Sequence, residues 1–306
     1  MTKQAETAIA DDIREYTRVD LDNISKRILS HRGILAHILK SCVIEFKDIP
    51  ISEIIEKGIV GNPEVSRIVG DNTEEVTYSG GKIRYDIRFR ATTPNQELTE
   101  LIVNIEAQND YYPGYSLVKR GGFYCSTLLS GQKNTEFEHS NYDDIKKVYS
   151  IWICTQPPKE RENSIKRYRT IEEDVLGQGV KEPLENYDLM SIIMVYLGNE
   201  EDDNCVGILR LLETLLISEK NAEQKLDILK TEFEIEVTKE LEKEVSQMCN
   251  ISKGVEEKGI QKGIQEGLLQ AIKNLMDNAD WSIEQAMKML GISEEEQLIY
   301  KEKLEK

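Results

Sequence analysis

The sequence contains few cysteines and histidines, and it lacks the spacings in which these residues usually bind metals. Five cysteines stand singly among 306 residues, and no pair has Cys-x-x-Cys spacing. This argues against a zinc site and against a disulfide framework. The three histidines are also scattered, and no Ser/His/Asp or Cys/His arrangement indicates nucleophilic catalysis. An odd number of isolated cysteines favours a reducing cytoplasm.

Long apolar runs are absent as well. The longest lies near Ile192–Leu197, far short of the roughly 20 apolar residues that a membrane-spanning helix needs. The first residues, MTKQAETAIADD, lack the apolar region of a signal peptide. Aromatic residues make up only 7% of the chain and charged residues 31%, so we expect an ordinary core and a strongly solvated surface. These features predict a cytoplasmic protein without a membrane partner.

The net charge of −17 argues against a protein that coats nucleic acids nonspecifically. The acidic excess is concentrated in residues 200–306, which carry 25 Asp and Glu against 14 Lys and Arg. A protein that acts on nucleic acid needs only a positive track near its site. Local basic clusters in the first two-thirds of the chain could supply one: Lys82/Arg84/Arg88/Arg90, Lys119/Arg120, Lys146/Lys147 and Arg161/Lys166/Arg167/Arg169.

Two short runs of alternating apolar and polar residues are the most informative part of the chain. Lys82–Arg90 (KIRYDIRFR) and Leu101–Gln108 (LIVNIEAQ) both alternate strictly, which is typical of half-buried strands. A polar connection containing Pro94 and Asn95 joins them. We therefore expect an antiparallel pair of strands.

The register of this pair brings two carboxylates together. If the pair is symmetric about Gln96, Asp86 lies opposite Glu106 and Arg84 lies opposite Gln108. Like charges that face each other across two strands are destabilising. A bound divalent cation is one physical reason for such an arrangement to persist. The ordinary alternative is a solvated strand face on which Asp86 pairs with a neighbouring arginine.

Further patterns predict an α/β domain over residues 21–203, after a loose segment at residues 1–20. We expect helices at Leu21–Glu45 (with Gly33 as a potential break) and Tyr115–Leu129, a short helix or turn at Ile51–Gly61, an edge strand from Val65–Val69 and Glu75–Tyr78, and buried strands at Tyr149–Thr155 and Ser191–Leu197. Residues 204–306 read as an acidic helical region, with helices at Val206–Ile217 and Ala222–Met248 and two short ones within Ser282–Lys303, joined at Gly291–Ile292.

Glycines recur at about every fourth residue in this region, at Gly254, Gly259, Gly263 and Gly267. Each glycine costs a helix roughly 1 kcal/mol relative to alanine. The run is therefore either a weak, flexible helical linker or a stripe along which another backbone packs closely. The second reading allows a homodimer formed through the C-terminal helices.

The residues of the hairpin carry a resemblance to a known family. Asp86, followed after nineteen residues by Glu106-Ala107-Gln108, resembles the PD-(D/E)xK nuclease motif. The order NIEAQ, then Arg120-x-x-x-Tyr124, then the strand YSIWI is similar to the Rpn-type recombination-promoting nucleases and putative transposases of bacteria. The resemblance covers roughly residues 20–200, and glycine-rich tails are also common in that group. It implies a restriction-endonuclease-like α/β core, in which helices flank a mixed central sheet, followed by an all-α extension.

The resemblance also implies an activity, the metal-dependent hydrolysis of DNA phosphodiester bonds. The cofactor would be Mg²⁺, with Mn²⁺ as an alternative, and the partner would be DNA. Asp86 and Glu106 would bind the metal through carboxylates, and Ala107 through its backbone carbonyl. Glu45, at the end of the first expected helix, is a candidate for the additional acidic ligand that this fold often supplies.

Gln108 stands where the general motif has a lysine. A glutamine can donate a hydrogen bond to phosphate or orient a water molecule, but it supplies neither a cation nor a base. Arg84 or Arg120 could provide the missing charge. Together with Arg88 and Tyr124, they are the expected contacts to phosphate and DNA.

A rival hypothesis is that the protein has the nuclease fold but little or no nuclease activity. The glutamine would then mark weak or absent catalysis, and the protein would act as an interaction module through its acidic helical tail. A third hypothesis combines the two, because an acidic tail could mimic DNA and restrain the nuclease.

Overall fold

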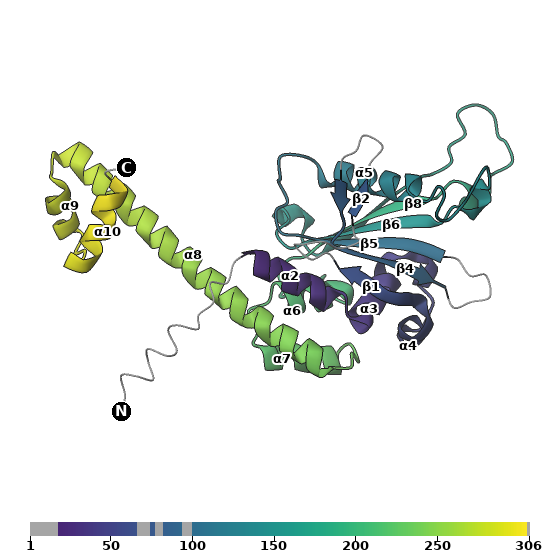
Figure 1. Cartoon of the computed structure of the whole chain (residues 1–306), viewed down its shortest axis with the longest axis horizontal. Coiled ribbons are helices and arrows are strands. Elements are labelled where there is room, and N and C mark those ends of the chain that lie inside the picture. The colour runs from purple at the N-terminus through teal and green to yellow at the C-terminus, as the bar shows by residue number, and fades with distance from the viewer. Residues whose placement is uncertain (1–17, 66–73, 77–81, 94–99, 305–306) are drawn as a thin grey trace. The chain divides into compact units, whose positions relative to one another are not determined.

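The computed structural model describes residues 18–65, 74–76, 82–93 and 100–304 (Figure 1). The expected loose N-terminus, part of the expected edge strand and the hairpin turn with Pro94 and Asn95 lie outside these ranges. Contacts divide the chain into two compact units, Val19–Cys249 and one that contains Asn250–Lys306. The first unit therefore extends beyond residue 203, where the composition changes.

Within the described residues, one sheet contains six strands in the order β1-β4-β5-β6-β8-β7. These strands are β1 (Ile59–Val65), β4 (Ile87–Thr92), β5 (Glu100–Gln108), β6 (Lys147–Cys154), β7 (Ser164–Arg169) and β8 (Met190–Tyr196). β5, β6 and β8 run parallel, whereas the pairs β1–β4, β4–β5 and β7–β8 are antiparallel. The expected α/β class with a mixed sheet flanked by helices is therefore confirmed.

The helices of the first unit are α2 (Arg18–Leu29, which begins one residue before the unit), α3 (Arg32–Cys42), α4 (Ile51–Glu53), α5 (Leu117–Ser130), α6 (Ile208–Leu216) and α7 (Ala222–Thr231). Short helical turns are η1 (Ile44–Phe46), η2 (Ile54–Gly58), η3 (Tyr142–Asp144), η4 (Lys159–Arg161) and η5 (Leu184–Asn186). α8 (Lys239–Ala279) runs across the division, and α9 (Ile283–Met289) and α10 (Glu294–Leu304) follow it.

The hairpin has the expected register but not the expected length. Ile87 lies opposite Ile105, which makes the pair symmetric about residue 96. The run Lys82–Arg90 is not one strand, however. Its first part, β3 (Lys82–Arg84), pairs with β2 (Glu74–Val76) in a separate two-stranded sheet.

The expected pairing of Arg84 with Gln108 is therefore wrong, because Arg84 lies opposite Glu74. The strand is interrupted at Tyr85 and Asp86. Tyr85 is fully buried and its ring meets that of Tyr124 edge-on, with centroids 5.4 Å apart. This tertiary contact anchors the chain at the interruption.

Both faces of the central strands are buried. On one face, α5 packs on Val148, Trp152 and Met194 of β6 and β8. On the other, Tyr149 of β6 donates a hydrogen bond to Glu45 just after α3. In β5, Asn104 and Ile105 point to opposite faces and neither is exposed. The expectation of a half-buried second strand is thus wrong, because β5 lies in the interior of the sheet.

Two expectations about the flanking elements need correction. The first helix breaks at Ser30–His31 and not at Gly33, which lies in the first turn of α3. A Cβ at Gly33 would come within 3.2 Å of Ile235, so close packing accounts for this glycine. Strand β7 was not expected, since most of its side chains are exposed and give no buried alternation.

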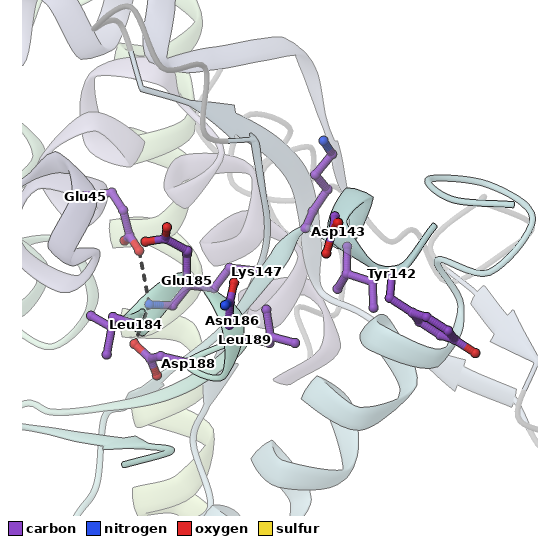
Figure 2. A pocket seen from close by; sticks show the side chains of 11 residues that line it. Glu45, Tyr142, Asp143, Lys147, Leu184, Glu185, Asn186, Asp188 and Leu189 are labelled. Atoms are coloured by element: carbon purple, nitrogen blue, oxygen red, sulfur yellow. Dashed lines mark hydrogen bonds and ion pairs between the residues drawn. The ribbon is translucent and has the colours of Figure 1, made fainter. Parts of the chain in front are cut away.

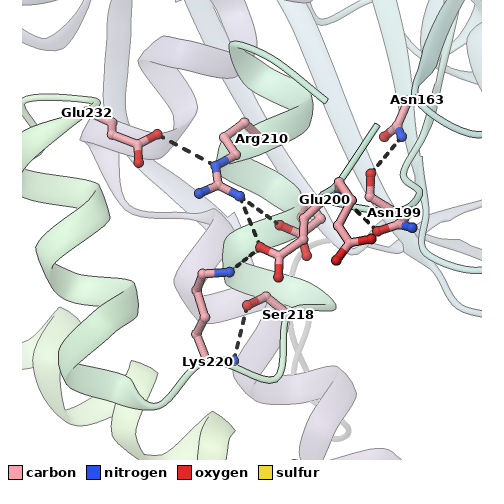
Figure 3. Close-up of polar contacts among 9 residues, drawn as sticks. Asn163, Asn199, Glu200, Arg210, Ser218, Lys220 and Glu232 are labelled. Atoms are coloured by element: carbon pink, nitrogen blue, oxygen red, sulfur yellow. Dashed lines mark hydrogen bonds and ion pairs between the residues drawn. The ribbon is translucent and has the colours of Figure 1, made fainter. Parts of the chain in front are cut away.

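Polar contacts tie α6 and α7 to the segment that follows β8 (Figure 3). Arg210 of α6 binds Glu200 at 3.0 Å and Glu232 at 3.6 Å, and Lys220 also binds Glu200. The expected single helix Ala222–Met248 is interrupted between α7 and α8 at residues 232–238. Glu234 there has a φ of +54°, which no α-helix accommodates.

In the second unit, the end of α8 packs with α9 and α10 around Ile272, Ala286, Met287, Ile292 and Tyr300. The two short helices meet at Gly291, as expected, with a φ of +70°. The glycine-rich run lies inside α8. A Cβ at Gly254, Gly263 or Gly267 would meet no atom within 4 Å, so no described residue of this chain packs closely on these three positions. Among the described residues, no helix is long and apolar enough to cross a membrane.

Alanine substitutions at two adjacent glycines of α5 should have opposite effects on stability. A Cβ at Gly121 would lie 2.7 Å from Ile192, whereas at Gly122 the nearest atom is 3.8 Å away. We expect Gly121→Ala to lower the free energy of unfolding by about 1–3 kcal/mol through overpacking. Gly122→Ala should raise it by up to about 1 kcal/mol through helix propensity. Urea unfolding measures both; equal effects would contradict the close packing of α5 on the sheet.

Candidate active site

The structure brings Asp86 and Glu106 together at the end of β5, next to the start of β4. The backbone N–H of Asp86 donates to Glu106 Oε1 at 3.2 Å. The N–H of Ala107 donates to Asp86 Oδ2 at 3.1 Å. The N–H and C=O of a strand residue point to the same side, so the Ala107 carbonyl also faces Asp86. The structure thus places Asp86 next to Glu106 and Ala107.

Asn104, two residues earlier in β5, fixes the Glu106 carboxylate through a hydrogen bond. Its side chain is completely buried, and Nδ2 donates to Glu106 Oε1 at 2.7 Å. Asn104 Oδ1 has no hydrogen-bond partner within the described part of the chain. No motif in the sequence marks Asn104 as a site residue, although its position two residues before Glu106 puts both side chains on one strand face.

Two residues of α2 complete the cluster, and sequence reasoning missed both. Lys26 Nζ lies 2.8 Å from Asp86 Oδ1 and 2.6 Å from Asp22 Oδ2. Lys26 is only 8% exposed. The spacing of Asp22 and Lys26 is visible in the sequence, but an i, i+4 pair usually marks an exposed helix surface. Nothing in the local pattern predicts that Asp86 is the third partner.

Burial controls the protonation of these groups. It raises the pKa of Glu106 well above its usual range, and the adjacent charge of Asp86 raises it further. Burial also raises the pKa of Asp86, whereas Lys26 opposes that change. Burial disfavours the charge of Lys26, but Asp86 and Asp22 outweigh it and raise the pKa of the ammonium group. Glu106 is therefore the more readily protonated carboxyl, and Asp86 is the partner of Lys26.

Arg120 and Tyr124 lie on one turn of α5 beside the cluster. Arg120 donates to the Tyr124 hydroxyl from Nη2 at 2.6 Å and from Nε at 3.1 Å. Its guanidinium also lies over the Trp152 ring, 5.1 Å from the centroid. The charge of Arg120 acts to lower the pKa of Glu106. Tyr124 packs on Tyr85, next to Asp86, and Trp152 lies opposite Glu106, so this helix face lies beside the carboxylates.

Three further residues were expected at the site: Gln108, Arg88 and Arg84. Gln108 Nε2 donates to the backbone carbonyl of Asp110, at the start of the next loop. Arg88 lies opposite Asn104, with its guanidinium 5.8 Å from the centroid of the Tyr85 ring. The backbone of Arg84 belongs to β3, and its side chain lies outside the described residues.

Glu45 does not join the carboxylate pair. It lies 3.1 Å from Lys147 Nζ (Figure 2). It also accepts a hydrogen bond from Tyr149 at 2.6 Å. Lys147 begins β6, and its β5 neighbour Leu101 is five residues before Glu106. Five residues of strand span about 16 Å. The idea that Glu45 supplies an additional ligand to the pair is therefore wrong.

A cavity of about 580 Å³ surrounds this second group of charges at the amino edge of β6. Lys147 there also lies 2.7 Å from Asp188 (Figure 2). Glu45 and Asp188 of this cavity thus share a cation of their own. Among the described residues, no group of three or more His, Cys, Asp or Glu side chains is arranged to hold a metal ion.

The chain matches no protein-family model, and searches of curated proteins and of solved structures found no significant match.

Because Lys26 is buried between carboxylates, we expect its replacement to destabilise the fold strongly and replacement of the neighbouring Arg27 to destabilise it little. Lys26→Met leaves Asp86 and Asp22 without their common partner, so we expect a loss of about 3 kcal/mol in the free energy of unfolding. Arg27→Met removes a half-exposed guanidinium 3.4 Å from Glu244 and should cost less than about 1 kcal/mol. Urea unfolding at neutral pH compares them. Similar losses for both variants would contradict the central role given to Lys26.

Proposed function

We propose that this protein is a metal-dependent DNA endonuclease of the PD-(D/E)xK kind, related to the Rpn-type recombination-promoting nucleases. The observation that carries the proposal is the meeting of two carboxylates: the Asp86 N–H donates to Glu106, and the Ala107 N–H donates to Asp86. The order of elements supports it, since an antiparallel hairpin is followed by a helix and then by a parallel strand beside the hairpin. The carboxylates lie at the carboxyl edge of the parallel strands, where α/β sheets commonly bind ligands.

The donors at this edge fit a hard divalent cation. Asp86, Glu106 and the Ala107 carbonyl offer only oxygen atoms, and Mg²⁺ typically takes one or two carboxylates together with water. Mn²⁺ accepts the same donors. A bound divalent ion would neutralise charge on the phosphate and lower the pKa of a bound water molecule. Asp22 is a third carboxylate within reach of the same lysine.

The surrounding residues suit phosphodiester cleavage. Lys26 and Arg120 place two cations beside the carboxylates, and both can stabilise negative charge that develops on the phosphate. Lys26 is thus a candidate for the cation that Gln108 does not supply. The amide of Gln108 can donate to a phosphate oxygen or to a water molecule once it leaves Asp110.

We place this activity in the cytoplasm, where DNA substrates of a bacterial recombination nuclease lie. All five cysteines are free, and four of them are buried. Unpaired thiols are typical of a reducing compartment.

The proposal predicts nicking of supercoiled plasmid DNA with Mg²⁺ and no nicking with EDTA. Glu106→Gln should lower the rate by about 100-fold or more, because loss of an outer-shell partner alone often costs about 10–100-fold. Glu45→Gln is the matched control, since it removes a carboxylate at the opposite edge of the sheet, and it should nick at the wild-type rate. Unchanged nicking by Glu106→Gln would rule out the assignment.

Plasmid nicking also separates the proposal from its rival. A folded wild-type protein that cuts neither duplex nor single-stranded DNA with Mg²⁺ or Mn²⁺ would favour the interaction module. In that case the Asp86–Lys26 ion pair would serve stability alone.

A further inference from the structure

A loop rich in tyrosine connects the candidate site to α5. It spans residues 109–116, beginning directly after Gln108 and ending at the N-cap Ser116. Thr155 Oγ1 donates to Asn109 Oδ1 at 2.8 Å, and the N–H of Tyr112 donates to Asp110 Oδ1 at 2.8 Å. The loop is thus fixed to the ends of β5 and β6 at the edge that carries Glu106.

The loop presents aromatic rings to solvent around a cavity. Tyr112 is 74% exposed and Tyr115 is 53% exposed, which is unusual for large aromatic side chains. The cavity measures about 360 Å³ and is lined by Tyr111, Tyr112, Gly114, Tyr115, Ser116, Leu117, Val118 and Met194. Its walls are aromatic and aliphatic, so they suit a flat, weakly polar group.

Arg120 links the cavity to the carboxylates. Its Nη1 donates to the Tyr115 hydroxyl at 3.1 Å, and its guanidinium lies over the ring of Trp152, the residue opposite Glu106 in the next strand. The exposed Lys119 precedes it on α5. Arg120 therefore contacts both a tyrosine of the cavity and the strand residue beside Glu106, and it is a cation of the kind that binds phosphate. A nucleotide offers the matching pair of groups, a flat base and an adjoining phosphate.

Only an unpaired base can use such a cavity. In a duplex, both faces of each base are covered by its neighbours, whereas single strands expose base faces that stack on aromatic side chains. Stacking does not depend on net protein charge. It would therefore provide affinity to a chain whose charge of −17 weakens general attraction to DNA.

We propose that the Tyr112–Tyr115 cavity binds an unpaired DNA base next to the cleaved phosphate, and that the substrate is single-stranded or branched DNA. This inference rests on the proposed nuclease function and specifies its substrate. Arg120 positions the phosphate that follows the bound base.

The test measures binding of the full chain to a fluorescently labelled oligonucleotide in EDTA, so that no cleavage occurs. Fluorescence anisotropy compares the single strand with the blunt duplex of the same sequence. Wild type should bind the single strand more tightly. Tyr112→Ala/Tyr115→Ala should weaken single-strand binding about tenfold or more, with less than about a twofold change for the duplex.

Two further variants sharpen the result. Tyr142→Ala removes a tyrosine that is 63% exposed and lines the cavity at the opposite edge of the sheet, so it should bind as wild type does. Tyr115→Phe keeps the ring but loses the hydroxyl that accepts from Arg120, and it should retain most of the single-strand affinity. Retention by Tyr115→Phe together with loss in the double alanine variant identifies stacking as the cause.

Equal binding of single strand and duplex by wild type would overturn the inference. So would single-strand affinity that is unchanged in the double alanine variant. The proposed nuclease function would survive either result if plasmid nicking still required Glu106. It would fail together with the inference if no DNA were bound or cut.

Discussion

The candidate site depends on one buried ion pair, between Lys26 of α2 and Asp86 at the start of β4. Asp86 is held beside Glu106 by two backbone hydrogen bonds, and the two carboxyl groups raise each other's cost of ionisation in a buried setting. Lys26 offsets this cost for Asp86. Without a cation at this point, the hairpin would carry an uncompensated buried charge, which is strongly destabilising.

The same requirement connects stability with the proposed chemistry. The carboxylate oxygens of Asp86 and Glu106 need a positive charge beside them. Either the Lys26 ammonium group or a bound metal ion can supply it. Arg120 adds a second cation on the α5 side, so two cations accompany the carboxylates although the chain is acidic. Such local charge is what phosphate binding requires. The aromatic loop beside Arg120 then extends the site from phosphate toward base.

The sequence predicted the parts of this arrangement that follow from local patterns. Alternation and turn composition predicted the register of β4 and β5, and hence the meeting of Asp86 with Glu106. Partners from distant segments could not be predicted this way. The i, i+4 spacing of Asp22 and Lys26 is typical of an exposed helix surface, and only tertiary packing brings Lys26 to Asp86. The predicted position of Glu45 beside the carboxylate pair is wrong for the same reason. The position of a residue along a helix does not reveal which end of a neighbouring strand its side chain contacts. Strand β7, exposed at the sheet edge, left no periodic signal.

The most direct test of the account is a crystal structure of the full chain soaked with Mn²⁺, with data collected at a wavelength where manganese scatters anomalously. The account predicts an anomalous peak between the carboxylates of Asp86 and Glu106, with the Lys26 ammonium group displaced from Asp86. A structure without a peak there, in which Lys26 still binds Asp86, would contradict the claim that this cluster is a metal site.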